Sequence, residues 1–381
     1  MWTELWNNKH EILNNYWTIL KPYKYLIFCC IALLFLLGVY LTISIISWRQ
    51  KQHNGKNNIA ATLASATLDT GYHTATITIT DTDISEKTHE LFTNNTPPQL
   101  TLEFIQPGDY QCGNLMQYLD SIYLVHMNQP NIQARGFDTL AELTQKYHDA
   151  FCQPITPTET QYVINQLSQL AYGLSHHKRD YFNKWLSQSK LVKAQPWLEG
   201  GMPHTHGPCI ILTPKWFVNT DANIVFHEIT HIHQRLQPHD FDQLYHNWGF
   251  SRVSSTPKGL ETIFLRSRIN PDALDINWTW THNTTQYWIG AVYNSINPDS
   301  IHDIDFLAYP LAYNGDYLGT QPLKLASWPA FTQYFGNSRN HYHPFEIAAF
   351  YMENYLANTS TLKQTTAYPI FESWFNSLKN V

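Results

Sequence analysis

The sequence has few charged residues and no excess of basic ones. Only 14% of its 381 residues are Asp, Glu, Lys or Arg, and 24 basic residues stand against 30 acidic ones, for a net charge of -6. Proteins that follow the phosphates of nucleic acids carry a strong excess of Lys and Arg, so nucleic acid is not an expected partner. Hydrophobic residues make up 43% of the chain, enough to form a buried core, which excludes a disordered protein.

Cysteine is also scarce. The chain has five cysteines and no two have the CxxC spacing, which excludes a disulfide-rich scaffold and a cysteine-based zinc module. Cys29 and Cys30 lie in an apolar run, so one pair among Cys112, Cys152 and Cys209 can form a disulfide, and the sequence does not say which. No basic neighbour of Cys209 lowers its thiol pKa, so we do not expect it to be a nucleophile.

One long segment lacks charge altogether. Residues 25–48 contain no Asp, Glu, Lys, Arg or Pro, and as a helix they are about 36 Å long, enough to cross a hydrocarbon core of about 30 Å. We predict a short N-terminal tail over 1–24, an uncleaved transmembrane helix over 25–48 and a polar stalk over 49–70. Basic residues flank both ends of the helix equally, but long domains are translocated largely regardless of such charges. We therefore expect a single-pass membrane protein whose body lies outside the cytoplasm.

The remaining chain changes from strand to helix periodicity. Alternating residues over 74–80 and an apolar run over 100–105 predict strands, and hence a small β-rich region over 71–130. Apolar residues spaced by three or four predict helices within 137–147 and 163–174, and Cys209–Leu212 reads as a further strand. We assign 131–381 to one α+β domain.

An HExxH pattern in an apolar stretch indicates a metal-binding helix. His227 and His231 are one helical turn apart, so their imidazoles can bind one tetrahedral Zn²⁺, and Glu228 can act as general base on a zinc-bound water. A pair of buried core histidines is the alternative. Random placement of this composition gives only about 0.03 such matches, so composition alone does not account for the pattern.

A third protein ligand must come from a distant segment, because catalytic zinc keeps three protein ligands and a water. The extended HExxHxxGxxH form is absent, since Gln234 and Gln237 occupy its last two positions. We predict Glu346 as the third ligand and Glu353, two turns later, as an acceptor for a ligand imidazole. Glu261 is the rival third ligand.

These motifs resemble the zincin metallopeptidases, in the gluzincin arrangement of two His and one Glu. The resemblance rests on the HExxH helix, the strand before it and the distant Pro-x-Glu-x-x-Ala pattern, within residues 205–238 and 341–355. It implies an α+β domain in which the active-site helix packs under a small sheet. It also implies an edge strand, here near Cys209–Leu212, that holds an extended peptide by strand addition.

The resemblance implies zinc-dependent hydrolysis of peptide bonds, with a peptide or protein as substrate. A further donor would stabilise the oxyanion, and the sequence offers Tyr342, His341, His343, Tyr309 and Tyr313. Two alternatives share the same residues. One is a catalytically inactive zincin-fold protein that serves as a surface or envelope binding module, and the other is a hydrolase of a non-peptide amide.

Overall fold

The computed structural model describes residues 74–77, 100–218, 222–337 and 341–378. The chain divides into two compact units, 1–65 and 66–381, and every described residue belongs to the second. The predicted tail, transmembrane helix and polar stalk therefore lie outside the described residues. Within the described ranges, no helix is both long enough and apolar enough to cross a membrane.

The first sheet has five strands in the order β1-β2-β3-β5-β4. Its three central strands run parallel, whereas the edge strands β1 and β4 pair antiparallel to their neighbours. Alternate side chains of β5 pack into two different cores. Ile210 and Leu212 pack with the apolar residues around α8 (Ile224–Leu236), and Cys209 and Ile211 pack with those around α3 (Tyr110–Tyr118) and α5 (Leu140–Ala150). The strands are β1 Thr74–Ile77, β2 Leu100–Ile105, β3 Lys190–Lys193, β4 His204–His206 and β5 Cys209–Leu212.

The predicted strands exist, but they do not form a separate β-rich region over 71–130. β2 pairs in parallel with β3, and the chain after it is largely helical, with α3 at Tyr110–Tyr118 and α4 at Gln129–Ala134. Alternation along a strand reveals which face is buried but not which strand is its partner. For this reason the pattern did not show that β2 belongs to the sheet completed by residues 190–212.

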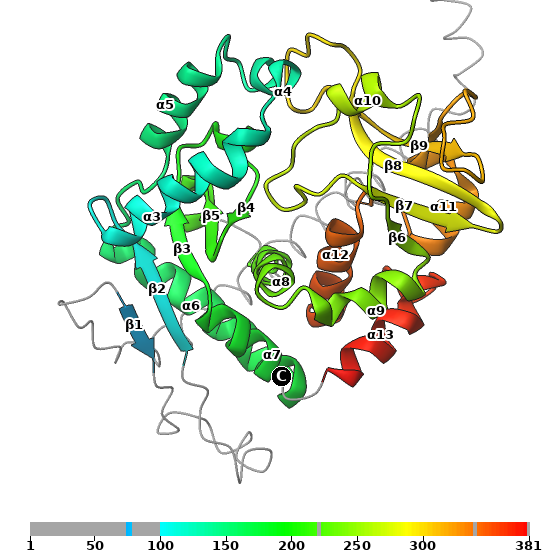
Figure 1. The fold of residues 1–381 in the computed structure, drawn as a ribbon. Coiled ribbons are helices and arrows are strands. Elements are labelled where there is room, and N and C mark those ends of the chain that lie inside the picture. Colours follow the sequence, from blue (N-terminus) through cyan, green and yellow to red (C-terminus); the bar gives the residue numbers. More distant parts are fainter. Residues whose placement is uncertain (1–73, 78–99, 219–221, 338–340, 379–381) are drawn as a thin grey trace, which may run out of the picture. The chain divides into compact units, whose positions relative to one another are not determined.

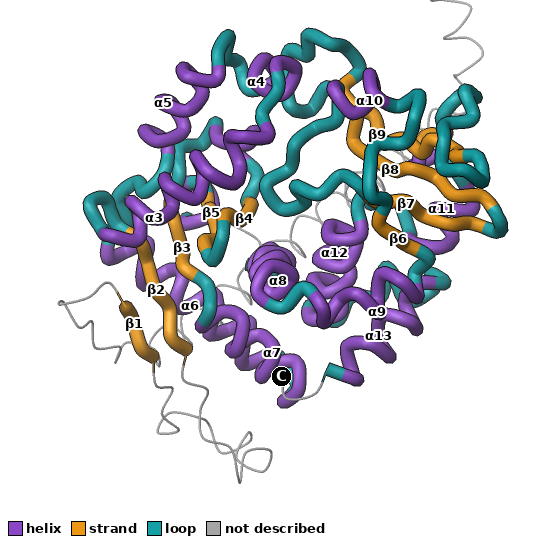
Figure 2. Tube along the Cα trace, in the orientation of Figure 1, coloured by secondary structure: helices purple, strands orange, loops and turns teal. Residues whose placement is uncertain are grey.

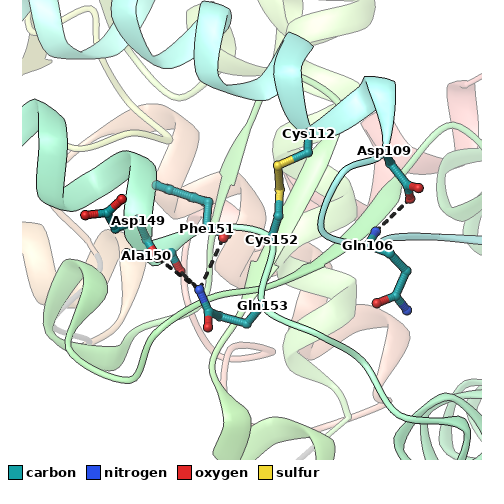
Figure 3. The surroundings of a disulfide bond; sticks show 8 residues. All are labelled: Gln106, Asp109, Cys112, Asp149, Ala150, Phe151, Cys152 and Gln153. Atoms are coloured by element: carbon teal, nitrogen blue, oxygen red, sulfur yellow. Dashed lines mark hydrogen bonds between the residues drawn. A yellow bond between two sulfur atoms is a disulfide. The ribbon is translucent and has the colours of Figure 1, made fainter.

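The two predicted helices after residue 131 are confirmed as α5, Leu140–Ala150, and α6, Pro157–Gly173. α6 begins with a capping box, in which Thr156 and Glu159 bind each other's backbone N–H groups. A disulfide between Cys112 and Cys152 joins α3 to the segment that follows α5 (Figure 3). It holds together the helices that cover one face of the first sheet.

The second sheet is antiparallel throughout, in the order β10-β9-β8-β7-β6. Trp280 on β7 and Trp288 on β8 are buried. The strands are β6 Phe250–Arg252, β7 Trp278–His282, β8 Thr285–Tyr293, β9 Ile304–Leu311 and β10 Leu323–Lys324.

Two helices lie between the sheets and carry the residues of the HExxH and Pro-x-Glu patterns. α8 contacts β4 and β5 on one side and α12 on another, and both helices appear between the two groups of strands (Figure 1, Figure 2). The helices not yet given are α7 His176–Ser187, α9 His239–Asn247, α10 Glu261–Leu265, α11 Pro329–Phe335, α12 Pro344–Leu356 and α13 Ala367–Ser377. The described residues are thus a mixed α+β structure.

Candidate metal centre

α8 presents both histidines of the HExxH pattern on one face. Val225, Ile229 and Ile232 are fully buried in the core and hold the helix in place. His227 and His231 are one turn apart, and the centroids of their rings are 4.8 Å from each other. Local helix geometry therefore places the two imidazoles together, as predicted.

α12 brings the predicted third residue to these rings. Pro344 occupies its first turn, and Ala348 and Ala349 are fully buried, so that α12 can approach α8 closely. Glu346 Oε2 lies 3.3 Å from His227 Nε2 and 3.9 Å from His231 Nε2. The sequence reasoning thus found the three residues that meet, although more than a hundred residues separate Glu346 from α8.

The three side chains fit a divalent metal ion. One potential ligand atom from each of His227, His231 and Glu346 lies within 4.8 Å of the others. Ligands about 2.1 Å from a tetrahedral zinc ion lie roughly 3.4 Å apart, which is close to the two separations measured from Glu346. His231 Nε2 is buried and has no hydrogen-bond partner, and a buried polar atom of this kind needs one. Two imidazole nitrogens and one carboxylate oxygen also match the donors of catalytic zinc sites.

Further side chains orient the ring nitrogens that face away from this point. Glu353 Oε2 is 3.5 Å from His227 Nδ1, near the place predicted for it, but the two atoms are not hydrogen-bonded. Gln234 Oε1 accepts a hydrogen bond from His231 Nδ1 at 2.7 Å, which leaves Nε2 of that ring free for the metal. Gln234 is itself held by the Tyr245 hydroxyl and a backbone carbonyl. The sequence analysis used Gln234 only to exclude a longer motif, although its position one turn after His231 was a signal for this role.

Asn270 holds the predicted third ligand, Glu346, and the sequence analysis missed Asn270. Its Nδ2 donates to Glu346 Oε1 at 2.5 Å and to the Tyr342 hydroxyl at 2.6 Å. With Oε1 held in this way, Oε2 remains directed at the two histidines. Asn270 begins an Asn-Pro-Asp turn, in which the Ala273 N–H donates to the Asn270 carbonyl. Local turn chemistry does not reveal that a side chain of the turn reaches α12.

Glu228 is buried beside His227, His231 and Glu346, which we call the triad, and it has an unbonded carboxylate oxygen. Glu228 is only 1% exposed, and its Oε2 has no hydrogen-bond partner. Burial raises the pKa of Glu228 well above its usual range, and the nearby carboxylates of Asp272 and Glu346 raise it further. A cation held by the triad would oppose this shift, because it would favour the ionised form.

The edge of the first sheet is not where the sequence analysis placed it. β5 lies between β3 and β4, so Cys209–Leu212 is an internal strand and β4 is the edge. The outer backbone groups of Thr205 are already bonded: Asp272 Oδ1 accepts from its N–H at 2.9 Å, and Arg235 Nη2 donates to its C=O at 3.1 Å. Strand addition at Thr205 would require both side chains to move. The prediction that Cys209–Leu212 is the edge strand is therefore wrong, whereas peptide binding by strand addition stays a prediction.

The other predicted side chains differ in their relation to the triad. Tyr342 is joined to it through Asn270, and burial followed by the charge of Glu346 raises its pKa. His343 caps α12 by accepting from the Phe345 N–H, while its Nε2 donates to a backbone carbonyl. Both nitrogens of His343 are therefore engaged, and it is not free to donate to a substrate.

His341 and Glu261, the rival third ligand, are not part of the triad. Nδ1 of His341 bonds the Gly336 carbonyl, and burial lowers the pKa of its imidazole to about 4. Glu261 is exposed and accepts hydrogen bonds from the Gly259 N–H. Of the two remaining donor candidates, Tyr313 is fully exposed, and Tyr309 packs in a separate apolar cluster with Trp288.

A second buried polar cluster supports the segment that carries Asn270. Glu199 accepts from Arg135 Nη2 at 2.9 Å and from the hydroxyls of Tyr123 and Tyr147, each at 2.6 Å. Arg135 Nη2 also donates to the Ile269 carbonyl at 3.0 Å, directly beside Asn270. The sequence analysis did not detect this cluster, because its members come from separate segments and follow no motif.

Comparisons with models of protein families, with curated proteins and with solved structures give no match for this chain. The assignment of a function therefore depends on the chemistry of the residues described above.

Proposed function

We propose that this chain is a zinc-dependent metallopeptidase of the zincin type. The observation that carries the proposal is the convergence of His227, His231 and Glu346 beside a buried carboxylate without a full set of hydrogen bonds. Structural polar groups in a protein interior are normally satisfied by the protein itself. A group of donors that is incomplete in this way favours a bound cation and a reacting water over a structural role.

We assign two kinds of role to these residues, metal binding and orientation of the metal ligands. His227, His231 and Glu346 would hold the zinc ion, and Asn270, Gln234 and Glu353 would fix the orientation of these three ligands. A bound zinc ion supplies Lewis-acid chemistry, since it polarises a carbonyl and lowers the pKa of water.

Glu228 is the proposed general base. It would take a proton from the attacking water and pass it to the leaving amine. Tyr342 is the strongest of the predicted oxyanion donors, because it is the one that shares a hydrogen-bond partner with Glu346. The hydroxyl has to turn toward the substrate to act in this way.

We further propose that the chain is anchored by residues 25–48 with residues 66–381 outside the cytoplasm. The Cys112–Cys152 disulfide supports this orientation, because such bonds persist in oxidising compartments and are rare in the cytosol.

A peptide-cleavage assay on the full chain in detergent tests the proposed activity. A library of internally quenched peptides should be hydrolysed, 1,10-phenanthroline should abolish hydrolysis, and added zinc should restore it. Zinc binding without cleavage of any library member would instead favour the inactive binding module.

A further inference from the structure

Arg268 stands out among the arginines of the described residues because its guanidinium makes no hydrogen bond or ion pair. Arg135, Arg235 and Arg252 have carboxylate partners, and the other described arginines donate to backbone carbonyls. Nε of Arg268 is buried and unbonded. A guanidinium remains charged at any physiological pH; Arg268 is half-buried, and leaving its buried Nε without an acceptor costs stability. The absence of a partner among the described residues suggests that one comes from outside the chain.

Nearby acidic groups are already engaged. Glu199 is the acidic group whose charge acts on Arg268, but its carboxylate is bonded by Arg135 and two tyrosines. Glu346 is held by Asn270 and directed at the two histidines. Neither carboxylate is available to neutralise Arg268.

Arg268 lies next to the candidate metal centre. It lines a small cavity of about 10 Å³ together with Tyr342 and His343, which is room for about one water or one carboxylate oxygen. Tyr342 is bonded to Asn270, and Asn270 is bonded to Glu346. Arg268 is therefore linked to Glu346 through Tyr342 and Asn270, on the side of the candidate metal centre where this cavity lies.

We propose that Arg268 binds a carboxylate of the substrate, an inference that rests on the proposed peptidase function. The planar guanidinium suits a carboxylate because it can donate two parallel hydrogen bonds. At Thr205 the outer backbone groups are bonded by Asp272 and Arg235, so a peptide cannot pair there as an added strand while those bonds are in place. A peptide therefore needs another anchor, and this favours the carboxylate at its C-terminus. An acidic side chain near the cleaved bond has the same chemistry, and the experiment separates the two sources.

The test measures equilibrium binding to the full-length Glu228→Gln variant, with and without zinc, so that turnover plays no part. Three N-acetylated tetra-alanine probes are compared: the free acid, its C-terminal amide, and an amide in which one alanine is replaced by glutamate. We expect the free acid to bind about 10- to 100-fold more tightly than the plain amide, as for a hydrogen bond between charged groups. A preference for the glutamate amide over the free acid would assign the site to acidic side chains instead of chain ends.

Variants of two neighbouring arginines supply the control. Adding Arg268→Gln should remove the preference for the carboxylate, and Arg268→Lys should keep part of it, because the charge remains but the paired hydrogen bonds do not. Arg266→Gln should leave the preference unchanged, since Arg266 donates to the Tyr293 backbone carbonyl. Thermal melts identify any variant that fails to fold.

The inference is overturned if free acid and amide bind equally, or if neither binds at millimolar concentration. It is also overturned if the preference survives in Arg268→Gln. A carboxylate preference in a protein that cleaves no peptide would leave the Arg268 site standing and refute the proposed hydrolysis, so the two failures can be told apart.

Discussion

Two buried polar clusters in this molecule contain similar residue types but differ in how completely they are bonded. Around Glu199, both carboxylate oxygens accept hydrogen bonds from Arg135, Tyr123 or Tyr147. Around the triad, Glu228 Oε2 and His231 Nε2 are buried without a partner. A satisfied cluster stabilises a fold, whereas an unsatisfied one costs stability and is retained where it serves a function. The contrast favours a structural role for the Glu199 carboxylate and supports the proposed chemical role of the triad.

The largest expected effect is the loss of activity in Glu228→Gln, a change in the triad cluster that should not reduce stability. Because the amide cannot act as a base, peptide hydrolysis should fall by about 10² to 10⁴-fold, while zinc content stays unchanged. The melting temperature should stay the same or rise, since the change removes a buried, incompletely bonded carboxylate. Steady-state kinetics and thermal melts measure both effects, and activity near the wild-type level would rule out Glu228 as the base.

Glu199→Gln should act on stability instead. The substitution leaves Arg135 as an uncompensated buried charge, since the two side chains are each only 2% exposed, and we expect a loss of about 3–5 kcal/mol in the free energy of unfolding. Zinc content at low temperature should be preserved in the folded fraction. Denaturant titration measures the loss; a variant as stable as wild type would show that the cluster is not a structural support.

The pH dependence of stability should sharpen the same contrast. The ion pair with Arg135 and the nearby His204 hold the pKa of Glu199 far below its usual range despite burial. Because the folded state therefore favours the ionised form, this contribution is fully present above the unfolded-state pKa of about 4.3. It is lost progressively as the pH falls below that value. Acid titrations of wild type and Glu199→Gln should converge at low pH, and parallel curves would contradict the assignment.

A smaller effect is expected for Asn270→Ala. Without the Asn270 amide, Glu346 Oε1 loses its donor, and zinc affinity should fall about 10- to 100-fold, as for other residues that orient metal ligands. Asn314→Ala is the matched control, because Asn314 bonds only within an exposed turn. Competition with a chelating dye measures the affinity; equal losses in both variants would remove Asn270 from the metal site.

The sequence predicted the parts of the site that depend on one helix. His227 and His231 follow from a four-residue spacing, and Glu346 and Glu353 from a second helical pattern with a proline at its start. Asn270 could not be predicted, because a turn motif says nothing about which helix its side chains contact. The Glu199 partners come from segments 52 to 76 residues away, and no local pattern records such pairings.

For the fold, as for the site, the sequence predicted local elements but not the contacts between distant segments. Strands and helices with clear periodicity were found, and the mixed α+β class is confirmed. The order of strands was not predicted, since β5 is internal and β2 pairs with β3, which lies far along the chain. Pairing depends on the packing of both faces of the sheet, which alternation along one strand does not specify.

Metal analysis of the purified full-length chain tests the central claim most directly. After equilibration with excess zinc and removal of the unbound ion, wild type and Glu228→Gln should each retain one zinc per chain, and His231→Ala should retain much less. Absence of zinc from the folded wild-type chain, or equal zinc in His231→Ala, would contradict the account.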